Sequence, residues 1–472
     1  MQNNLAIRIR STEMKIILPV LMTSILLLSA CASTEKEPSR ATTNQSSLDN
    51  SLAATAAKYP KDTVALTQLA SQQLQEYEAN KNLYTLNQVI ASYDELYKRQ
   101  PYNHDVLLNY YRLNLIKSFG TNSYDIAYWQ TFFQQQPFLK TIDIAPPVYM
   151  KLPLAPRGSL SIEERINILQ ETVHDNPKFI NGNMALAATY VEQNNLQLAL
   201  FVLETAAKHN PESSDILGAL NEYRVDKIFD NLCHKDASQK LTQVFEDYKL
   251  LVKQAPENAY YHMQLSTVLR LMGKLRMSNF SAKKAASLDV DFKSALAESE
   301  FWLGNNKALT AYFSDKDMQS LSTDDLYLAI LSNVVNFNWQ TAADLMPEYI
   351  TRNDRSFYGV LYGAHAFKML GKSNVAKQIT ETGLTNVNLK PWHQQMLNYA
   401  NQQITSAELM AASKNNCNLS EAHFIEGLSD IKADNMTNFE KNMVAIVELN
   451  IYPFYEYAGA KQIIKRIKRS KP

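Results

Sequence analysis

The stretch of sequence that decides the fold is residues 180–213, INGNMALAATYVEQNNLQLALFVLETAAKHNPES. Its apolar side chains return every three or four residues in two successive segments, which is the spacing of two amphipathic helices. Pro211 ends the second segment, because proline has no backbone N–H to continue a helix. Small residues at Ala187, Ala199 and Ala206 would let the helices approach closely. The stretch therefore predicts a pair of antiparallel helices.

Proline ends similar segments along much of the chain. It stands at positions 60, 101, 137, 177, 211 and 256, at intervals of 34 to 45 residues. More degenerate copies of the pattern begin at Val106, Ala259, Phe357 and Ser420. The spacing and the small residues resemble those of tetratricopeptide repeats, which have a period of about 34 residues. The resemblance implies an all-α fold, a right-handed superhelical solenoid of antiparallel helix pairs over residues 51–472. A generic helical-hairpin solenoid is the alternative.

Composition agrees with helices. Gly occurs 12 times and Pro 16 times in 472 residues, which leaves few of the turn clusters that bound strands. The Pro-rich segment 138–161 interrupts the repeats and is typical of a loop, with a candidate break there between two lobes. Ser161 and Glu164 have the spacing of a capping box, which predicts that a helix begins at this point.

The N-terminal sequence has the features of a secretory signal. Lys15 precedes an apolar run, Ile16–Leu28, that is too short to span a bilayer. The run leads into Leu28-Ser29-Ala30-Cys31, which resembles the lipobox of bacterial lipoproteins. The resemblance implies that residues 1–30 are cleaved as a signal peptide and that the Cys31 thiol carries a lipid.

The residues around this lipobox add three points. Residues 31–50 are polar and contain almost nothing to bury, as in a disordered tether. Ala32 stands where inner-membrane lipoproteins typically carry Asp, so the resemblance implies the periplasmic face of the outer membrane. An ordinary signal followed by a coincidental cysteine is the alternative. Because Met14 directly precedes the signal, translation from Met1 or from Met14 stays open.

Signals for catalysis and for nucleic-acid binding are absent from the sequence. Lys and Arg together number 47, as do Asp and Glu, so the basic excess of nucleic-acid-binding proteins is missing. No HExxH or HxxEH zinc motif and no GxSxG nucleophile motif occurs. Gly371-Lys372-Ser373 ends like a phosphate-binding loop, but Ala366 stands where that loop needs glycine. We therefore expect no enzyme activity, no cofactor and no metal site.

The inner face of each first helix is the surface with which tetratricopeptide proteins hold a peptide or a partner helix. The resemblance places this groove at positions 2, 5, 9 and 12 of a repeat, where the chain has aromatic, flexible and cationic side chains suited to peptide binding. A solvated face without function would have a similar composition. The predicted groove residues are Tyr110, Asn114, Lys117, Tyr260, Met263, Thr267, Arg270, Tyr358, Leu361, His365 and Lys368.

Two cysteines remain besides the lipobox cysteine. Cys233 and Cys417 could pair in an oxidising compartment, but solenoid repeats contact only their neighbours and these residues lie several repeats apart. Two separate thiols are the preferred expectation, with pairing left open. The C-terminal segment KQIIKRIKRSKP, residues 461–472, predicts an amphipathic helix that caps the last repeat. Added contact with a membrane or a polyanion is the alternative.

The lipobox and the repeats together resemble outer-membrane tetratricopeptide lipoproteins of Gram-negative bacteria, and segment 420–427 is similar to the start of their last repeats. The resemblance implies a non-enzymatic periplasmic scaffold or adaptor that binds envelope proteins or peptides, is held to the membrane by its lipid and binds no nucleic acid. Two alternatives stay open. One is a SusD-like lipoprotein that binds glycans or peptides, and the other is a cell-wall enzyme of the lytic transglycosylase type, for which Glu298-Ser299 is a partial match. The partner, the pathway and the oligomeric state are not readable from the residues.

Overall fold

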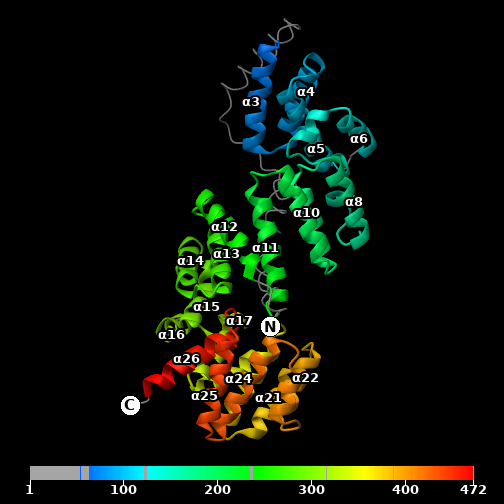
Figure 1. The fold of residues 1–472 in the computed structure, drawn as a ribbon. Coiled ribbons are helices and arrows are strands. Elements are labelled where there is room, and N and C mark those ends of the chain that lie inside the picture. Colours follow the sequence, from blue (N-terminus) through cyan, green and yellow to red (C-terminus); the bar gives the residue numbers. More distant parts are fainter. Residues whose placement is uncertain are drawn as a thin grey trace. The chain divides into compact units, whose positions relative to one another are not determined.

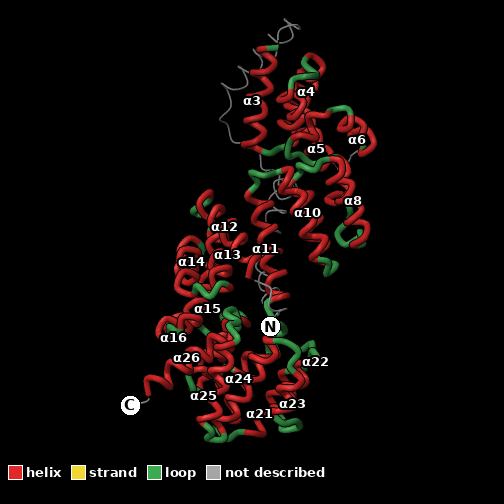
Figure 2. Tube along the Cα trace, in the orientation of Figure 1, coloured by secondary structure: helices red, strands yellow, loops and turns green. Residues whose placement is uncertain are grey.

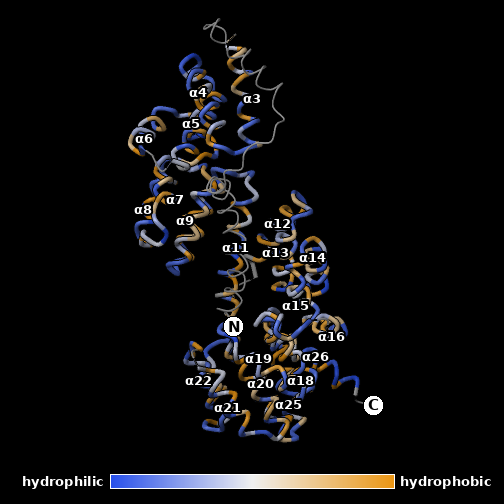
Figure 3. Tube along the Cα trace, turned by 180° about the vertical axis from the view of Figure 1, so that it is seen from behind, coloured by the Kyte–Doolittle hydropathy of each residue, from blue (hydrophilic) through white to orange (hydrophobic). Residues whose placement is uncertain are grey.

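The computed structural model describes residue 54 and residues 63–470, apart from 122–124, 234–237, 315 and 386. These residues form α-helices joined by turns and short 3-10 helices, and none of them lies in a strand (Figure 2). Hydrophilic and hydrophobic residues alternate along the helices, as expected for helices with one buried face (Figure 3). The predicted all-α fold is confirmed. The signal peptide, Cys31, the tether and both candidate start codons lie outside the described residues.

Contacts divide the chain into an N-terminal unit that ends at Leu220 and a C-terminal unit that starts at Asn221. The division falls within helix α11 (Ser214–Asn231). The Pro-rich sequence suggested a candidate break near 138–161 instead. That segment belongs to the N-terminal unit, where Val148 is buried. Its prolines shorten the helices there, but its apolar side chains still join the core.

The helices of the N-terminal unit begin where side chains can cap them. Asn82 and Asp125 accept hydrogen bonds from the backbone N–H groups of the first turns of α4 and α6, and Ser161 and Glu164 form the predicted capping box of α8. In chain order the elements are α3 (Val64–Asn80), α4 (Leu83–Arg99), α5 (His104–Thr121), α6 (Ile126–Gln134), η1 (Pro137–Thr141), η2 (Pro147–Met150), α7 (Lys151–Leu154), α8 (Ile162–Asp175), α9 (Ile180–Glu192), α10 (Leu196–His209) and the first part of α11 (Figure 1).

Helices α9 and α10 are the pair predicted from residues 180–213. Ala187 and Ala199 are 0% exposed and Ala206 is 1% exposed, so the small residues lie at the close contact between helices, as predicted. Asn194 takes a positive φ of 60° in the turn, and the Asn195 side chain accepts a hydrogen bond from the first turn of α10. The predicted, closely packed helix pair is therefore confirmed.

The C-terminal unit continues with helices in packed neighbouring pairs. Its elements after α11 are α12 (Ser238–Gln254), α13 (Ala259–Leu271), α14 (Leu275–Leu288), η3 (Val290–Phe292), α15 (Lys293–Leu303), α16 (Asn306–Ser314), η4 (Met318–Ser320), α17 (Thr323–Val335), α18 (Trp339–Asp344), α19 (Met346–Tyr349), α20 (Phe357–Met369), α21 (Ser373–Gly383), α22 (Pro391–Ala400), α23 (Ser406–Ala412), α24 (Asn416–Lys432), α25 (Met436–Glu448) and α26 (Tyr455–Ser470).

The degenerate copies of the repeat also form helix pairs. In α13 and α14 the two small positions are serines, and each hydroxyl donates to the other residue's carbonyl: Ser266 Oγ to Ser278 O and Ser278 Oγ to Ser266 O, both 2.8 Å. In α24 a side chain at Gly427 would meet Met443 Cε of α25 at 2.5 Å. Gly371 has a φ of 74° in the turn before α21, which explains the Gly-Lys-Ser sequence without a nucleotide. The handedness of the superhelix stays a prediction.

A disulfide joins Cys233, which follows α11, to Cys417 in the first turn of α24, with their Cα atoms 5.2 Å apart. The expectation of two separate thiols is wrong. It assumed that repeats contact only their sequence neighbours. In the C-terminal unit, residues 184 positions apart in the chain are instead brought into contact.

The C-terminal helix α26 supplies further long-range contacts within this unit. It packs against α25 and α24, as predicted for a cap, and also against α17 and α15 (Figure 1). Ile463 is fully buried, whereas Lys461, Lys465 and Lys468 are exposed, which agrees with the predicted amphipathic character. The helix therefore covers the first helices of earlier repeats as well as the end of the last one.

Candidate functional site

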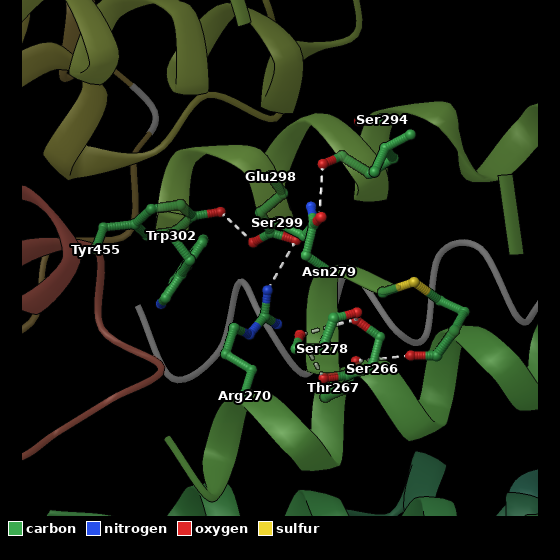
Figure 4. A network of polar contacts seen from close by, with 12 residues as sticks. Ser266, Thr267, Arg270, Ser278, Asn279, Ser294, Glu298, Ser299, Trp302 and Tyr455 are labelled. Atoms are coloured by element: carbon green, nitrogen blue, oxygen red, sulfur yellow. Dashed lines mark hydrogen bonds and ion pairs between the residues drawn. The ribbon is translucent and has the colours of Figure 1, made fainter. Parts of the chain in front are cut away.

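Two predicted groove residues of α13, Thr267 and Arg270, lie among buried polar contacts (Figure 4). Arg270 Nη1 lies 3.2 Å from Glu298 Oε2, and both side chains are less than 10% exposed. The Trp302 ring centroid lies 4.6 Å from the Arg270 guanidinium carbon, and Tyr455 donates a hydrogen bond of 2.6 Å to Glu298 Oε1. Because Tyr455 opens α26, Arg270 helps to hold the protein's own C-terminal helix. The expectation that Arg270 faces an open groove is wrong.

The other predicted residues of α13 also have partners inside the unit. Thr267 is 4% exposed and donates to the backbone oxygen of Met263, which is itself half-buried. Tyr260 donates a hydrogen bond of 2.9 Å to Glu222 Oε2 on α11. These predicted groove residues therefore contact neighbouring groups of the same unit.

Tyr358, a predicted groove residue of α20, and Tyr362 of the same helix each bind a buried carboxyl group. Tyr358, 3% exposed, donates to Glu421 Oε1 at 2.8 Å, and Tyr362 donates to Glu456 Oε1 at 2.5 Å. Burial, together with the neighbouring Glu421 charge, raises the pKa of Glu456 to about 7. Tyr358 thus binds a buried acid of α24, and the adjacent Leu361 is 5% exposed.

In the N-terminal unit the structure places the three predicted residues on α5. Tyr110 is buried and stacks on Tyr97 of α4, with ring centroids 4.8 Å apart. Asn114 donates to the backbone oxygen of Tyr110, and Lys117 is half-buried. Tyr110 is therefore a core residue of its helix pair.

The remaining predicted residues, His365 and Lys368, line a pocket of about 530 Å³. Its walls come from the C-terminal halves of α20 and α24, from the end of α22 and from the turn 401–405. Lys432 of α24 lines the same pocket. The structure thus brings two ammonium groups and one imidazole to a single cavity.

The electrostatics of this pocket favour an anion. Burial and the charge of Lys432 lower the pKa of Lys368, and burial with both lysines lowers the pKa of His365 to about 3. Lys368 Nζ donates to the Ala400 carbonyl at 2.6 Å, and neither lysine forms an ion pair within the described chain. His365 Nε2 is buried without a hydrogen-bond partner. With a pKa of about 3 the His365 ring is neutral, so Lys368 and Lys432 supply the positive charge, and a bound anion would relieve their repulsion and accept hydrogen bonds from their ammonium groups.

One carboxylate, Glu408, also lines the pocket, but it is already bound. Its Oε2 accepts hydrogen bonds from Thr405 N at 2.7 Å and from Thr405 Oγ1 at 2.8 Å, as part of the capping box of α23. These bonds lower the pKa of Glu408 and keep it ionised. We call His365, Lys368 and Lys432 with their surrounding walls the lysine pocket.

Sequence reasoning missed Lys432. Counted from Phe357 and Ser420, Lys368 is at position 12 of its repeat and Lys432 at position 13 of its own. The groove positions did not include 13, and the local sequence carries no other signal that the two lysines meet. The two lysines meet because α20 and α24, which lie far apart in the sequence, both line one pocket.

Neither a cluster of metal-ligating side chains nor a membrane-spanning helix occurs among the described residues. Within residues 63–470 and their stated gaps, no three His, Cys, Asp or Glu side chains lie together so that they could hold a metal ion. None of the helices in the described part combines the length and the apolar character that crossing a bilayer requires. Glu298, the partial match to a cell-wall enzyme, is bound in the buried ion pair with Arg270.

Comparisons with known proteins find similar solved structures but no sequence match. No family model matches the chain. No curated protein matches its sequence. Among solved structures, the human IFIT1 dimer with PPP-AAAA is similar at a TM-score of 0.27 and 12% identity, over 64% of this chain and 69% of that one. The P58(IPK) TPR domain is similar at a TM-score of 0.25 and 12% identity, over 90% of this chain and 93% of that one. Scores this low carry no argument about this chain, so its own geometry must indicate what it does.

Proposed function

We propose that the protein is a membrane-anchored periplasmic scaffold that binds envelope proteins or peptides through its helical repeats. The observation that carries the proposal is the lysine pocket. It is an open, positively charged cavity on first helices of repeats, the elements with which solenoid proteins form their binding surfaces.

The chemistry of the pocket indicates the kind of segment that binds there. Lys368 and Lys432 supply ammonium donors without a partner carboxylate, so a carboxylate of the partner can accept charge-assisted hydrogen bonds from them. Leu361 and Leu397 add apolar walls for the residue next to that carboxylate. The favoured ligand is an acidic or C-terminal peptide segment of an envelope protein.

The proposed location rests on the lipobox and is supported by the disulfide. Cys31 and the residues before it resemble a lipidation site, which implies anchoring at the outer membrane. The Cys233–Cys417 bridge supports an oxidising compartment such as the periplasm, because disulfides seldom persist in the cytosol.

Binding is tested by affinity capture from crosslinked envelopes with Lys368→Ala/Lys432→Ala. We expect capture of the specific partner to fall at least about tenfold, because charged hot-spot contacts are worth about 2 kcal/mol or more each. The matched control, Lys377→Ala/Lys441→Ala, removes the same charge from exposed positions on α21 and α25. Unchanged capture by the pocket variant, or an equal loss with the control, contradicts the proposal.

The anchor is tested separately with Cys31→Ser. The thiol is the group that accepts the lipid, so the variant should disappear from the outer-membrane fraction. Fractionation of envelopes followed by immunoblotting measures this. A variant that stays in the outer membrane after a salt wash would show that another anchor exists.

A further inference from the structure

A second cavity, of about 960 Å³, lies in the N-terminal unit. Its size is at the upper end of the range of small-molecule binding sites, about 300–1,000 Å³. Its lining is mainly apolar, including Leu115 and Ile116 of α5, Met150 and Leu152 of the η2–α7 segment, Leu169 of α8 and Phe179 before α9. We call it the apolar cavity.

The cavity exists because of the Pro-rich segment predicted as a loop. Between α6 and α8 the chain forms the two 3-10 helices and the four-residue α7 in place of a full helix. Pro156 cannot continue α7, and Gly158 turns the chain with a φ of 76°. One wall of the cavity is therefore formed by a short segment in place of a long helix.

Arg112 and Arg157 give the cavity a positive side, together with Lys81, whose ammonium group lies over the Tyr77 ring. Arg112 lies four residues before Ile116 on the same face of α5, and Arg157 lies in the loop after α7. Both are exposed, and neither forms an ion pair with a described residue. Arg165, by contrast, is bound to Glu192.

Negative charge in the cavity is weak. Asp143 is its one lining carboxyl group, and it accepts a hydrogen bond of 2.9 Å from Ile180 N. Burial raises the pKa of Asp143. The cavity thus combines an apolar interior with uncompensated cations, which is complementary to a molecule with an apolar body and an anionic end.

We propose that the apolar cavity binds a single-chain anionic amphiphile, with the acyl chain among Leu115, Leu152 and Phe179 and the anionic head at Arg112 and Arg157. Each methylene group moved from water into such a site contributes about 0.8 kcal/mol. The apolar wall supplies affinity in this arrangement, and the arginines select a carboxylate or phosphate head. This site lies in the other unit from the lysine pocket and does not depend on the proposed function.

The test labels the full-length protein in cells with three photoactivatable probes of equal chain length. One is a fatty acid, one a lysophospholipid with a phosphate head, and one a neutral fatty alcohol. After irradiation, mass spectrometry maps the labelled peptides. We expect labelling at residues 115–116 or 150–153 by at least one anionic probe, about tenfold above the alcohol. The anionic probe that labels better identifies the source of the head group.

Variants separate charge from fold. Arg112→Gln/Arg157→Gln should remove the preference for the anionic probe, whereas Lys98→Gln/Lys208→Gln, which removes the same charge elsewhere in the unit, should keep it. Leu152→Trp, which fills part of the cavity, should reduce labelling by every probe. Equal labelling by acid and alcohol overturns the proposal. Labels found only outside the cavity, or a peptide of another protein crosslinked there instead of a lipid probe, overturn it as well.

Discussion

The Cys233–Cys417 bridge should be a major source of stability for the C-terminal unit, and Cys233→Ser/Cys417→Ser is the change that tests this. The bridge joins residues 184 positions apart. For a loop of that length, the loss of chain entropy in the unfolded state corresponds to about 5 kcal/mol at 25 °C. The expected loss is a large part of the stability of a typical domain.

Guanidinium unfolding followed by circular dichroism, with and without reductant, measures the effect. The unmodified protein should lose stability on reduction, and the double variant should start at the lower stability and show no further change. The reasoning is refuted if the two proteins unfold at the same denaturant concentration in the absence of reductant. It is refuted equally if the unreduced, denatured protein shows two reactive thiols at these cysteines.

Three further changes test other parts of the structure. Ala199→Leu should cost about 1–3 kcal/mol in thermal or denaturant unfolding, because Ala199 is 0% exposed at the contact of α9 with α10; an unchanged midpoint would contradict the packing described. Folding raises the pKa of Glu456, so the folded state favours the protonated form. The stability that this form contributes is complete below pH 4.5, the ordinary pKa of the group, and is lost as the pH rises through about 7. Glu456→Gln should therefore be most stabilising, relative to the unmodified protein, above pH 7, and a stability difference that does not vary between these pH values would refute the assignment. Arg270→Ala should destabilise the protein by about 3–5 kcal/mol because it leaves Glu298 charged and buried. The double variant Arg270→Met/Glu298→Gln should lose less stability. Equal losses would show that an unpaired buried charge is not the cause of the destabilisation.

Much of the fold was predictable because local rules determine it. The small residues of segment 180–213, and the side chains that cap helices, act within one helix pair and can be read from spacing alone. The capping box at Ser161 and the turn glycine Gly371 are examples in which a few neighbouring residues settle the backbone. The same rules were sufficient for the degenerate pairs, where Ser266 and Ser278 replace the usual alanines and satisfy each other's hydrogen bonds.

The binding surface was less predictable because it depends on contacts between distant parts of the chain. Arginine and tyrosine, the residue types of Arg270 and Tyr358, suit a buried polar network as well as they suit a ligand groove. What decides between these roles is the position of Tyr455 and Glu421, far along the chain. The pairing of Lys368 with Lys432 and the disulfide have the same origin, since no local pattern reports the packing of non-neighbouring repeats.

The polar contacts of α26 fix its position over part of the predicted groove in the C-terminal unit. Tyr455 binds Glu298 of α15, whereas the next residue, Glu456, accepts from Tyr362 of α20, so consecutive side chains attach the start of the helix to two different repeats. Gln462 adds a hydrogen bond of 2.6 Å to the Phe301 carbonyl. A shift of α26 by one residue would leave these buried groups unpaired, at a cost of about 1–3 kcal/mol for each neutral group and more for a charged one. The polar groups therefore set the register of α26. Under the proposed function, the partner binds outside the face that α26 covers, at Lys368 and Lys432 of the lysine pocket.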